Sequence, residues 1–286
     1  MALSRKALQN PVVRSFALAV VKYVLGGNKK AVPFWLRWGM ARAQAARRMS
    51  GLVRGTAIVW PEPGRAFTIR RDLPTPGRGQ VLILARSSAL SPGTERAFFL
   101  RARNTSATFP SFPGYSMAGE VVSVSKELSF QTGDVVAVAA PHASLAVVNA
   151  RQVHPVPHGI TAEKASFVQL GVIAVNALEQ SGVRPGDSVV VFGQGIIGQL
   201  LVQLAAARGA NPVISVARTD RRVSAALTNS AQKIVILERD GVDVLRDLEA
   251  PIVLDATGHP DAIALSLLAV RRCGTILIVG SPREAS

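Results

Sequence analysis

In the second half of the chain, two arrangements of hydrophobic and polar residues alternate, one typical of strands and one typical of helices. Short apolar runs rich in β-branched residues are typical of strands buried on both faces, and most are followed by apolar residues at helical spacing. The predicted strands cover residues 188–192, 212–216, 233–237, 252–254 and 275–279, and the predicted helices cover 199–208, 221–229 and 260–271. This alternation predicts a doubly wound sheet of parallel strands, an α/β fold of the Rossmann type.

The preceding part of the chain predicts an all-β domain instead. Short strands separated by Pro- and Gly-rich turns are expected at 56–60, 66–70, 80–85, 118–124 and 134–138. Their spacing is typical of a small barrel or sandwich. A helical region then begins at Thr161, a candidate N-cap, and runs to Gln180. We therefore predict an arm over 1–52, a β domain over 53–160 and an α/β domain over 161–286.

The charge of the chain is concentrated in this N-terminal arm. The net charge is +15, of which 11 positive charges lie in the first 54 residues, and the first acidic residue is Glu62. Residues 12–25 and 33–48 predict two amphipathic helices, the second with two of the three tryptophans beside arginines. The arm is expected to pack on the body, a second subunit or a partner protein, or to lie on an anionic membrane surface. Neither helix has about 20 uninterrupted apolar residues, so we expect no membrane span.

Composition also limits the location and the partners. The single cysteine, Cys273, excludes an intramolecular disulfide and a cysteine-rich zinc lobe. We expect a cytoplasmic protein, at the membrane periphery if the arm binds lipid. The charge outside the arm is nearly balanced, which argues against a nucleic-acid partner.

A glycine-rich turn, Gly193-Gln194-Gly195-Ile196-Ile197-Gly198, joins the first predicted parallel strand to a helix. G-x-G-x-x-G in this setting is typical of a site that binds the pyrophosphate of a dinucleotide. The first glycine permits the tight turn, the second lets the phosphates approach the backbone, and the third lets helix and strand pack closely. The N–H groups that open the helix then face the anion. We expect these six residues to bind the cofactor; the alternative is a glycine turn that holds no ligand.

The residues after the second parallel strand favour NADP(H) over NAD(H). An acidic residue there normally binds the ribose 2′-hydroxyl, but here Ala217 holds that position and Arg218 follows it. A guanidinium binds phosphate through two hydrogen bonds, so we expect Arg218 to bind the 2′-phosphate. In the alternative, Arg218 is an ordinary surface residue and Asp220 contacts the ribose. Further cofactor contacts are expected from residues that follow the fourth and fifth strands, namely Thr257, Gly258, Gly280 and Ser281.

The segments SALSPGTERAFF, FPGYSMAGEVV, TGDVVAV, VFGQGIIGQLLVQLA and GTILIVGS occur in this order. Their sequence resembles the medium-chain dehydrogenase/reductase superfamily over residues 53–286. The PGTER segment is most similar to zinc-free members, the bi-domain oxidoreductases and bacteriochlorophyllide dehydrogenase-type proteins. The resemblance implies a GroES-like substrate domain, a Rossmann domain, a nicotinamide cofactor and a small-molecule substrate. The superfamily's C-terminal return to the substrate domain is expected to be absent.

The resemblance also places the zinc ligands of related enzymes, and here this chain differs. The Cys-Gly-Ser/Thr-Asp motif of the zinc enzymes is replaced by Pro92-Gly93-Thr94-Glu95, and Gly-His-Glu by Gly114-Tyr115-Ser116. The third ligand falls near Leu170. Proline and leucine cannot bind zinc and tyrosine is a poor ligand, so we expect no metal.

Other groups must then polarise the substrate oxygen, and three are candidates for catalysis. The resemblance aligns Thr94 with the hydroxyl that relays a proton, while Tyr115 offers a phenolic O–H and Glu95 a carboxylate that orients either group. Alternatively, Thr94 and Glu95 cap a helix over 96–103, and Tyr115 is a core aromatic residue.

Three functions fit these observations. The first is a zinc-independent, NADP(H)-dependent oxidoreductase that transfers hydride to or from a carbonyl, an alcohol or an enone. The second is a non-catalytic NADP(H)-binding accessory or scaffold subunit that docks a partner through its basic arm. The third is a membrane-surface reductase of a lipid or pigment. A homo-oligomer is expected in each case unless the arm binds a different protein.

Overall fold

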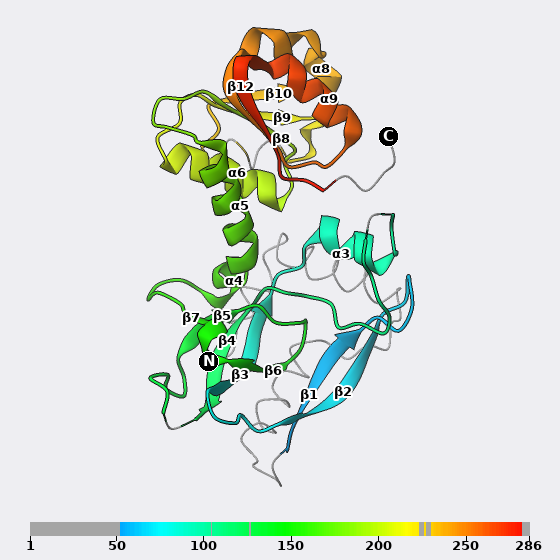
Figure 1. Ribbon diagram of the computed structural model, residues 1–286, viewed down its shortest axis with the longest axis vertical. Coiled ribbons are helices and arrows are strands. Elements are labelled where there is room, and N and C mark those ends of the chain that lie inside the picture. Colours follow the sequence, from blue (N-terminus) through cyan, green and yellow to red (C-terminus); the bar gives the residue numbers. More distant parts are fainter. Residues whose placement is uncertain (1–51, 104, 126, 223–225, 227–229, 282–286) are drawn as a thin grey trace. The chain divides into compact units, whose positions relative to one another are not determined.

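The computed structural model describes residues 52–103, 105–125, 127–222, 226 and 230–281, which form two compact units (Figure 1). Of these described residues, those from 52 to 89 and from 108 to 166 belong to the first unit, and those from 90 to 107 and from 167 to 281 belong to the second. The predicted arm lies outside the described residues except for Leu52. Its helices, and the domain boundaries at 53 and 161, therefore stay predictions.

The first unit is built on a five-stranded antiparallel sheet in the order β6-β3-β4-β5-β7. Along its three central strands, apolar residues at alternate positions face inward. These residues form one core, which includes Val81, Ile83, Met117, Val121 and Val136. This curled sheet confirms the GroES-like domain. The bounds are β3 Gln80–Ser88, β4 Met117–Val124, β5 Val135–Val138, β6 Leu145–Asn149 and β7 Val153–Pro155, with the 3₁₀ helix η2 Ala150–Gln152 and the helix α4 Ala162–Ala165.

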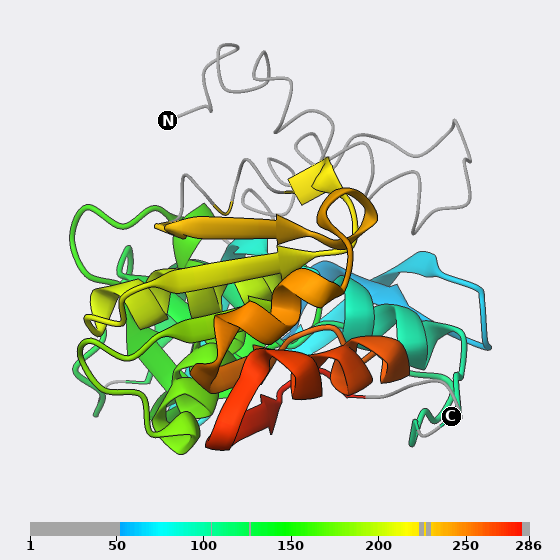
Figure 2. The ribbon, with the colours of Figure 1, turned by 90° about the horizontal axis from the view of Figure 1, so that it is seen from above.

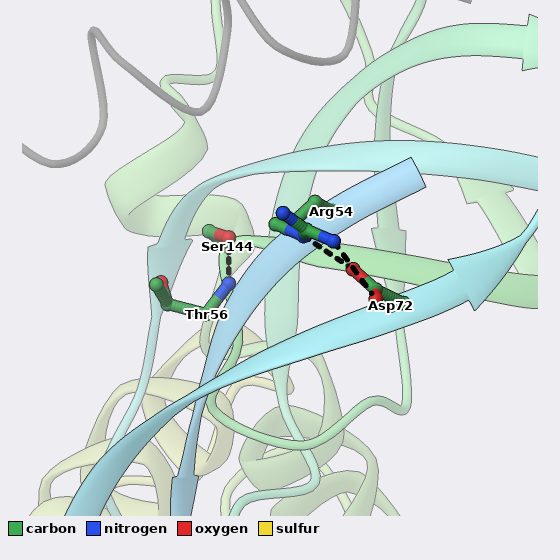
Figure 3. Close-up of polar contacts among 4 residues, drawn as sticks. All are labelled: Arg54, Thr56, Asp72 and Ser144. Atoms are coloured by element: carbon green, nitrogen blue, oxygen red, sulfur yellow. Dashed lines mark hydrogen bonds and ion pairs between the residues drawn. The ribbon is translucent and has the colours of Figure 1, made fainter. Parts of the chain in front are cut away.

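A two-stranded ribbon, β1 (Leu52–Val59) and β2 (Phe67–Pro74), is hydrogen-bonded to the segment just before β6, in part through the buried hydroxyl of Ser144. The Oγ of Ser144 accepts the N–H of Thr56 at 2.8 Å (Figure 3). The N–H of Ser144 donates to the carbonyl of Thr56, also at 2.8 Å. Arg54 and Asp72 form a two-point ion pair across the ribbon, at 2.6 and 3.2 Å. This hydrogen bonding lowers the pKa of the exposed Asp72 carboxyl.

Replacing Ser144 with alanine is expected to lower the free energy of unfolding by about 1–3 kcal/mol, because the Thr56 N–H loses its partner in a half-buried place. Arg54→Ala on the same strand should leave the denaturation midpoint nearly unchanged, since its ion pair is solvent-exposed. Urea unfolding followed by circular dichroism compares the two variants. Equal losses would contradict a specific role for the Ser144 hydroxyl.

The second unit contains five parallel strands in the order β10-β9-β8-β11-β12. Numbered along the chain, this is the order 3-2-1-4-5 of a Rossmann sheet. The five predicted apolar runs are therefore confirmed as strands. Their bounds are β8 Val189–Phe192, β9 Val213–Ala217, β10 Lys233–Ile236, β11 Ala250–Asp255 and β12 Val270–Ile278.

Helices cover both faces of this sheet, which explains why its strands are continuously apolar (Figures 1 and 2). Val189 and Val191 share a core with the helices α5 (Val168–Ser181) and α6 (Ile196–Ala207). On the opposite face, Val190 and Phe192 pack in the core that contains residues of α9 and η4. The helix α9 covers Pro260–Ala269 and the 3₁₀ helix η4 covers Asp243–Leu248.

Several elements differ from the sequence prediction. The helix α3 covers Pro92–Phe99, four residues earlier than expected, since Pro92 suits the first helical position. The strands β6 and β7 and the short helix α8 (Leu237–Asp240) were not predicted. The helix expected over 221–229 overlaps the 3₁₀ helix η3 (Asp220–Arg222), and most of its remainder lies outside the described residues. In the described part of the chain, no helix is both long and apolar enough to cross a membrane.

Candidate functional site

The glycine turn between β8 and α6 has the geometry that its spacing predicts. Gly193 has φ +87, and a Cβ there would lie 2.6 Å from Cγ2 of Thr257. A Cβ on Gly198 would overlap the carbonyl oxygen of Gly193. The chain itself thus requires the first and third glycines. Gly195 has no such neighbour, since the nearest atom to its Cβ position is Nη1 of Arg222 at 3.8 Å.

The remaining members of the motif are held at the N-terminus of α6. Gly195 is the N-cap, and Ile196 and Ile197 form the first turn, where Ile197 packs against the core. Gln194 is buried, and its Nε2 donates to the carbonyl of Val191 at 3.3 Å. The N–H groups of this first turn have no acceptor within the helix, which suits an anion.

The loops after β11 and β12 meet this turn at the carboxyl edge of the sheet. Gly258 has φ +65, and a Cβ there would lie 2.7 Å from the carbonyl oxygen of Ser281. A Cβ on Gly280 would overlap the backbone N of Gly258, so this position is also closely packed. Because Thr257 also contacts the Gly193 position, the structure brings the predicted cofactor residues of both loops together beside the turn.

Asp255, which the sequence reasoning missed, holds these loops in place. Its carboxylate is buried and accepts the Thr257 hydroxyl at 2.6 Å, the Thr257 N–H at 3.2 Å and the Gly258 N–H at 3.1 Å. Its carbonyl accepts the N–H groups of Val279 and Gly280 at 2.8 and 2.9 Å. An acidic residue that ends an apolar strand and precedes Thr and Gly was the available signal.

Asp255→Ala is expected to reduce the free energy of unfolding by about 3 kcal/mol, because hydrogen bonds to a charged acceptor each contribute about 1.5–3 kcal/mol and the freed N–H groups are poorly solvated. Asp243→Ala, an exposed carboxylate in the same unit, serves as the charge-matched control and should change stability little. Urea unfolding by circular dichroism measures both, and an Asp255→Ala midpoint equal to that of the control would refute the anchoring role.

Arg218, the predicted ligand of the 2′-phosphate, follows β9 and its side chain is 83% exposed. Its Nε lies 3.9 Å from Oε1 of Glu238 in α8, which is itself exposed, so this ion pair contributes little and leaves the guanidinium accessible. Asp240, at the end of α8, accepts hydrogen bonds from the Arg239 guanidinium and from the N–H of Ile236. These bonds lower the pKa of the Asp240 carboxyl to about 2. Asp220, the alternative ribose ligand, begins η3.

Arg222 is a second guanidinium at this edge that the sequence reasoning did not select. It ends η3, and its Nη1 is the atom nearest to the open side of Gly195. The signal for it was present, since Arg218, Arg221 and Arg222 fall within five residues after the second parallel strand. Arg222 thus stands near the glycine turn, where phosphate oxygens would be bound, and Arg218 lies four residues earlier in the chain.

The three predicted catalytic residues are divided between the units. Thr94 and Glu95 lie in α3 of the second unit, and Tyr115 precedes β4 in the first. Glu95 is buried, and its Oε1 accepts the N–H of Ser91, the N-cap of α3, at 2.8 Å. This contact favours the capping alternative for Glu95. Thr94 is half-buried.

Tyr115 follows a tightly packed glycine. Gly114 has φ +95, and a Cβ there would lie 2.7 Å from Cγ of the His142 ring. His142 is held in turn by its N–H, which donates to the Pro113 carbonyl at 2.7 Å, and by a hydrogen bond between Nδ1 and the Ser88 hydroxyl. The half-buried Tyr115 is therefore carried by a rigid segment.

The positions that correspond to zinc ligands do not fit that metal. Pro92 begins α3, Leu170 is buried within α5, and Tyr115 is the only one of the three with a donor oxygen. Within the described ranges, no group of three or more His, Cys, Asp or Glu side chains is placed to hold a metal ion. No step of a mechanism can be assigned to zinc on these residues.

Comparisons with known proteins agree with this architecture. Residues 197–286 match the family described as zinc-binding dehydrogenase. The chain is 25% identical over 245 residues to 2-desacetyl-2-hydroxyethyl bacteriochlorophyllide A dehydrogenase of Cereibacter sphaeroides, covering 80% of this chain and 74% of that protein. It is 27% identical over 134 residues to sorbitol dehydrogenase of Bacillus subtilis, covering 45% of this chain and 38% of that protein. The match thus spans well under half the length of the sorbitol dehydrogenase.

Solved structures show the same fold. A protein of Sinorhizobium meliloti described as a zinc-binding dehydrogenase, bound to NADP, superposes with a TM-score of 0.72 at 18% identity over 82% of this chain and 78% of that one. An Escherichia coli protein described as a short chain alcohol dehydrogenase, complexed with NADH, has a TM-score of 0.70 at 19% identity over 79% and 76%. At these identities the likeness establishes the fold alone. Of these two structures, one contains NADP and the other NADH.

Proposed function

Because the chain belongs to the medium-chain dehydrogenase/reductase superfamily, we propose that it is a zinc-independent oxidoreductase that uses NADP(H). Hydride would pass between the cofactor and a carbonyl, alcohol or enone carbon of a small molecule. The observation that carries the proposal is the exposed guanidinium of Arg222, whose Nη1 lies 3.8 Å from the open Cβ position of Gly195, together with the accessible guanidinium of Arg218 just after β9. A cationic edge next to a pyrophosphate turn favours a dinucleotide with an additional phosphate.

Each part of the site has a role in binding this cofactor. The N–H groups that open α6 would bind the pyrophosphate, and Gly195, which has no side chain, would leave room for it. Arg218 binds the 2′-phosphate. Thr257, Gly258, Gly280 and Ser281, which Asp255 holds at the same edge, would bind the nicotinamide half.

Bound NADP(H) supplies the hydride, and the protein must stabilise the charge that develops on the substrate oxygen. In the absence of zinc ligands, Thr94 and Tyr115 supply hydroxyl donors for this oxygen. Glu95 acts through α3, since its carboxylate caps the helix that carries Thr94.

Calorimetric titration with NADPH and NADH tests the proposal. We expect NADPH to bind at least about tenfold more tightly, since one charge-assisted contact contributes about 1.5–3 kcal/mol. Equal affinities would reject NADP(H) specificity, and failure to bind either dinucleotide would reject both the enzyme and the accessory-subunit function.

Tyr115→Phe and Thr94→Val are each expected to lower kcat by about 100-fold while NADPH affinity stays within twofold, since they remove a donor to the reacting oxygen and leave the glycine turn intact. Stopped-flow oxidation of NADPH with a panel of aldehydes, ketones and enones measures the effect. Unchanged kcat in both variants would remove these residues from catalysis.

One observation favours a second function, an NADP(H)-binding accessory subunit without turnover. Glu95, one of the three predicted catalytic groups, is engaged in capping α3. Tight NADPH binding with no hydride transfer to any member of the panel would select this function.

The basic arm would then bind the partner. This partner would be a different protein, a second copy of the chain, or an anionic membrane that presents a lipid or pigment substrate. Liposome flotation with and without residues 1–52 tests the membrane case, and light scattering tests the homo-oligomer. A cytoplasmic location remains a prediction alongside these.

A further inference from the structure

Two glutamines connect the glycine turn to the arginine-bearing 3₁₀ helix η3. Gln199, in the first turns of α6, donates from Nε2 to Oε1 of Gln194 at 3.1 Å and to the carbonyl of Arg222 at 3.3 Å. Gln194 donates in turn to the carbonyl of Val191 in β8. A side-chain amide has two N–H donors, so Gln199 forms both bonds at once. The result is a continuous polar link from β8, through the turn, to η3.

The link acts on the backbone of Arg222, and thereby on its side chain. The Arg222 guanidinium has its Nη1 3.8 Å from the Cβ position of Gly195, and among the described residues no other atom outside the neighbouring chain lies within 4 Å of that position. In the described part of the chain no acidic side chain forms an ion pair with it, and Arg218 and Arg221 stand near it in sequence with the same charge. Like charges repel, so the placement of Arg222 depends on what holds its main chain.

We propose that Gln199 is a positioning residue for phosphate binding: by holding the Arg222 carbonyl, it keeps this guanidinium beside Gly195, against the phosphate oxygens of the bound dinucleotide. The inference rests on the proposed NADP(H) function and adds to it a residue that contacts no cofactor. The ligand chemistry is a phosphate oxygen, supplied either by the pyrophosphate or by the 2′-phosphate.

The test compares Gln199→Met with Gln203→Met in titrations with NADPH and NADH. Methionine matches glutamine in length and helix propensity but cannot donate. Gln203 is the matched control, one turn further along α6, since its Nε2 donates to the carbonyl of Gln199 at 3.1 Å and not to η3. We expect Gln199→Met to weaken NADPH binding about fivefold to tenfold and Gln203→Met to leave it unchanged, in keeping with the loss of one positioning hydrogen bond. A matching loss for NADH assigns the contact to the pyrophosphate, and a loss confined to NADPH assigns it to the 2′-phosphate.

A double-mutant cycle separates positioning from a general effect on the turn. If Gln199 acts through Arg222, Gln199→Met should add less than twofold in the Arg222→Ala background. Full additivity would overturn the proposal, as would wild-type affinity in Gln199→Met. Gln199→Ala provides a second variant, and circular dichroism melts confirm that each variant is folded. Failure of the function looks different: if the wild-type chain binds neither dinucleotide, the proposed function is rejected and this inference with it, whereas NADPH binding that depends on Arg222 but not on Gln199 rejects the inference alone.

Discussion

Replacing both Arg218 and Arg222 with alanine is expected to reduce NADPH affinity by at least about 100-fold. Each guanidinium would form charge-assisted hydrogen bonds to a phosphate, and such bonds contribute about 1.5–3 kcal/mol apiece, so that two of them correspond to roughly two or more powers of ten. NADH affinity should fall less, because it lacks the 2′-phosphate. The selectivity for NADPH should therefore disappear in the double variant.

Isothermal titration at low and moderate salt measures this effect. Arg246→Ala is the charge-matched control. Arg246 is exposed and lies in η4, which packs on the face of the sheet opposite to α6. The two single variants with lysine in place of arginine should retain part of the affinity, since lysine keeps the charge but cannot form the two-point contact. NADPH affinity equal to that of the wild-type chain in the double alanine variant would exclude this edge as the phosphate site.

Gly198→Ala is expected to destabilise the second unit by about 3 kcal/mol or more and to abolish binding of either dinucleotide. The added Cβ would lie closer than 3.0 Å to the main-chain carbonyl of Gly193, so helix and turn must separate. Overpacking of a rigid backbone contact generally costs about 1–3 kcal/mol or more, and the displaced α6 would no longer present its N–H groups to the pyrophosphate.

Two other glycines serve as controls for this variant. Gly171→Ala in α5 meets nothing within 4 Å and should stabilise the helix by up to about 1 kcal/mol. Gly195→Ala also has room and should fold normally, yet weaken both dinucleotides, because its methyl group would occupy the side on which the phosphates approach. Thermal melts and titrations on the three variants separate stability from binding. A Gly198→Ala variant as stable as Gly171→Ala would contradict the close-packing role.

Local patterns in the chain were sufficient to predict much of the second unit. The five parallel strands follow from short apolar runs, since a strand covered by helices on both faces has no polar side. The roles of Gly193 and Gly198 follow from their spacing between a strand and a helix, because close packing there leaves no room for a side chain. Strand β7, by contrast, has only three residues and contains Pro155, so no alternation is visible in it.

Long-range polar contacts had no such signal. Thr56 and Ser144 are 88 residues apart, and Gln199 and Arg222 are 23 apart, and in neither case does the sequence reveal that one side chain reaches the other backbone. The capping contact between Glu95 and Ser91 is local, yet its pattern fitted a catalytic carboxylate equally well. Only coordinates distinguish a carboxylate that bonds a backbone N–H from one that is available to a ligand.

By itself, the sequence thus determined the fold class and the place of the glycine turn, because these depend on periodicity and on backbone sterics. Only the tertiary structure revealed Asp255 as the anchor of two loops, Arg222 beside Gly195 and the Gln194–Gln199 link. The physical reason is that hydrogen bonds and close contacts between distant segments form where the parallel strands end together, and that meeting point is a property of the folded sheet.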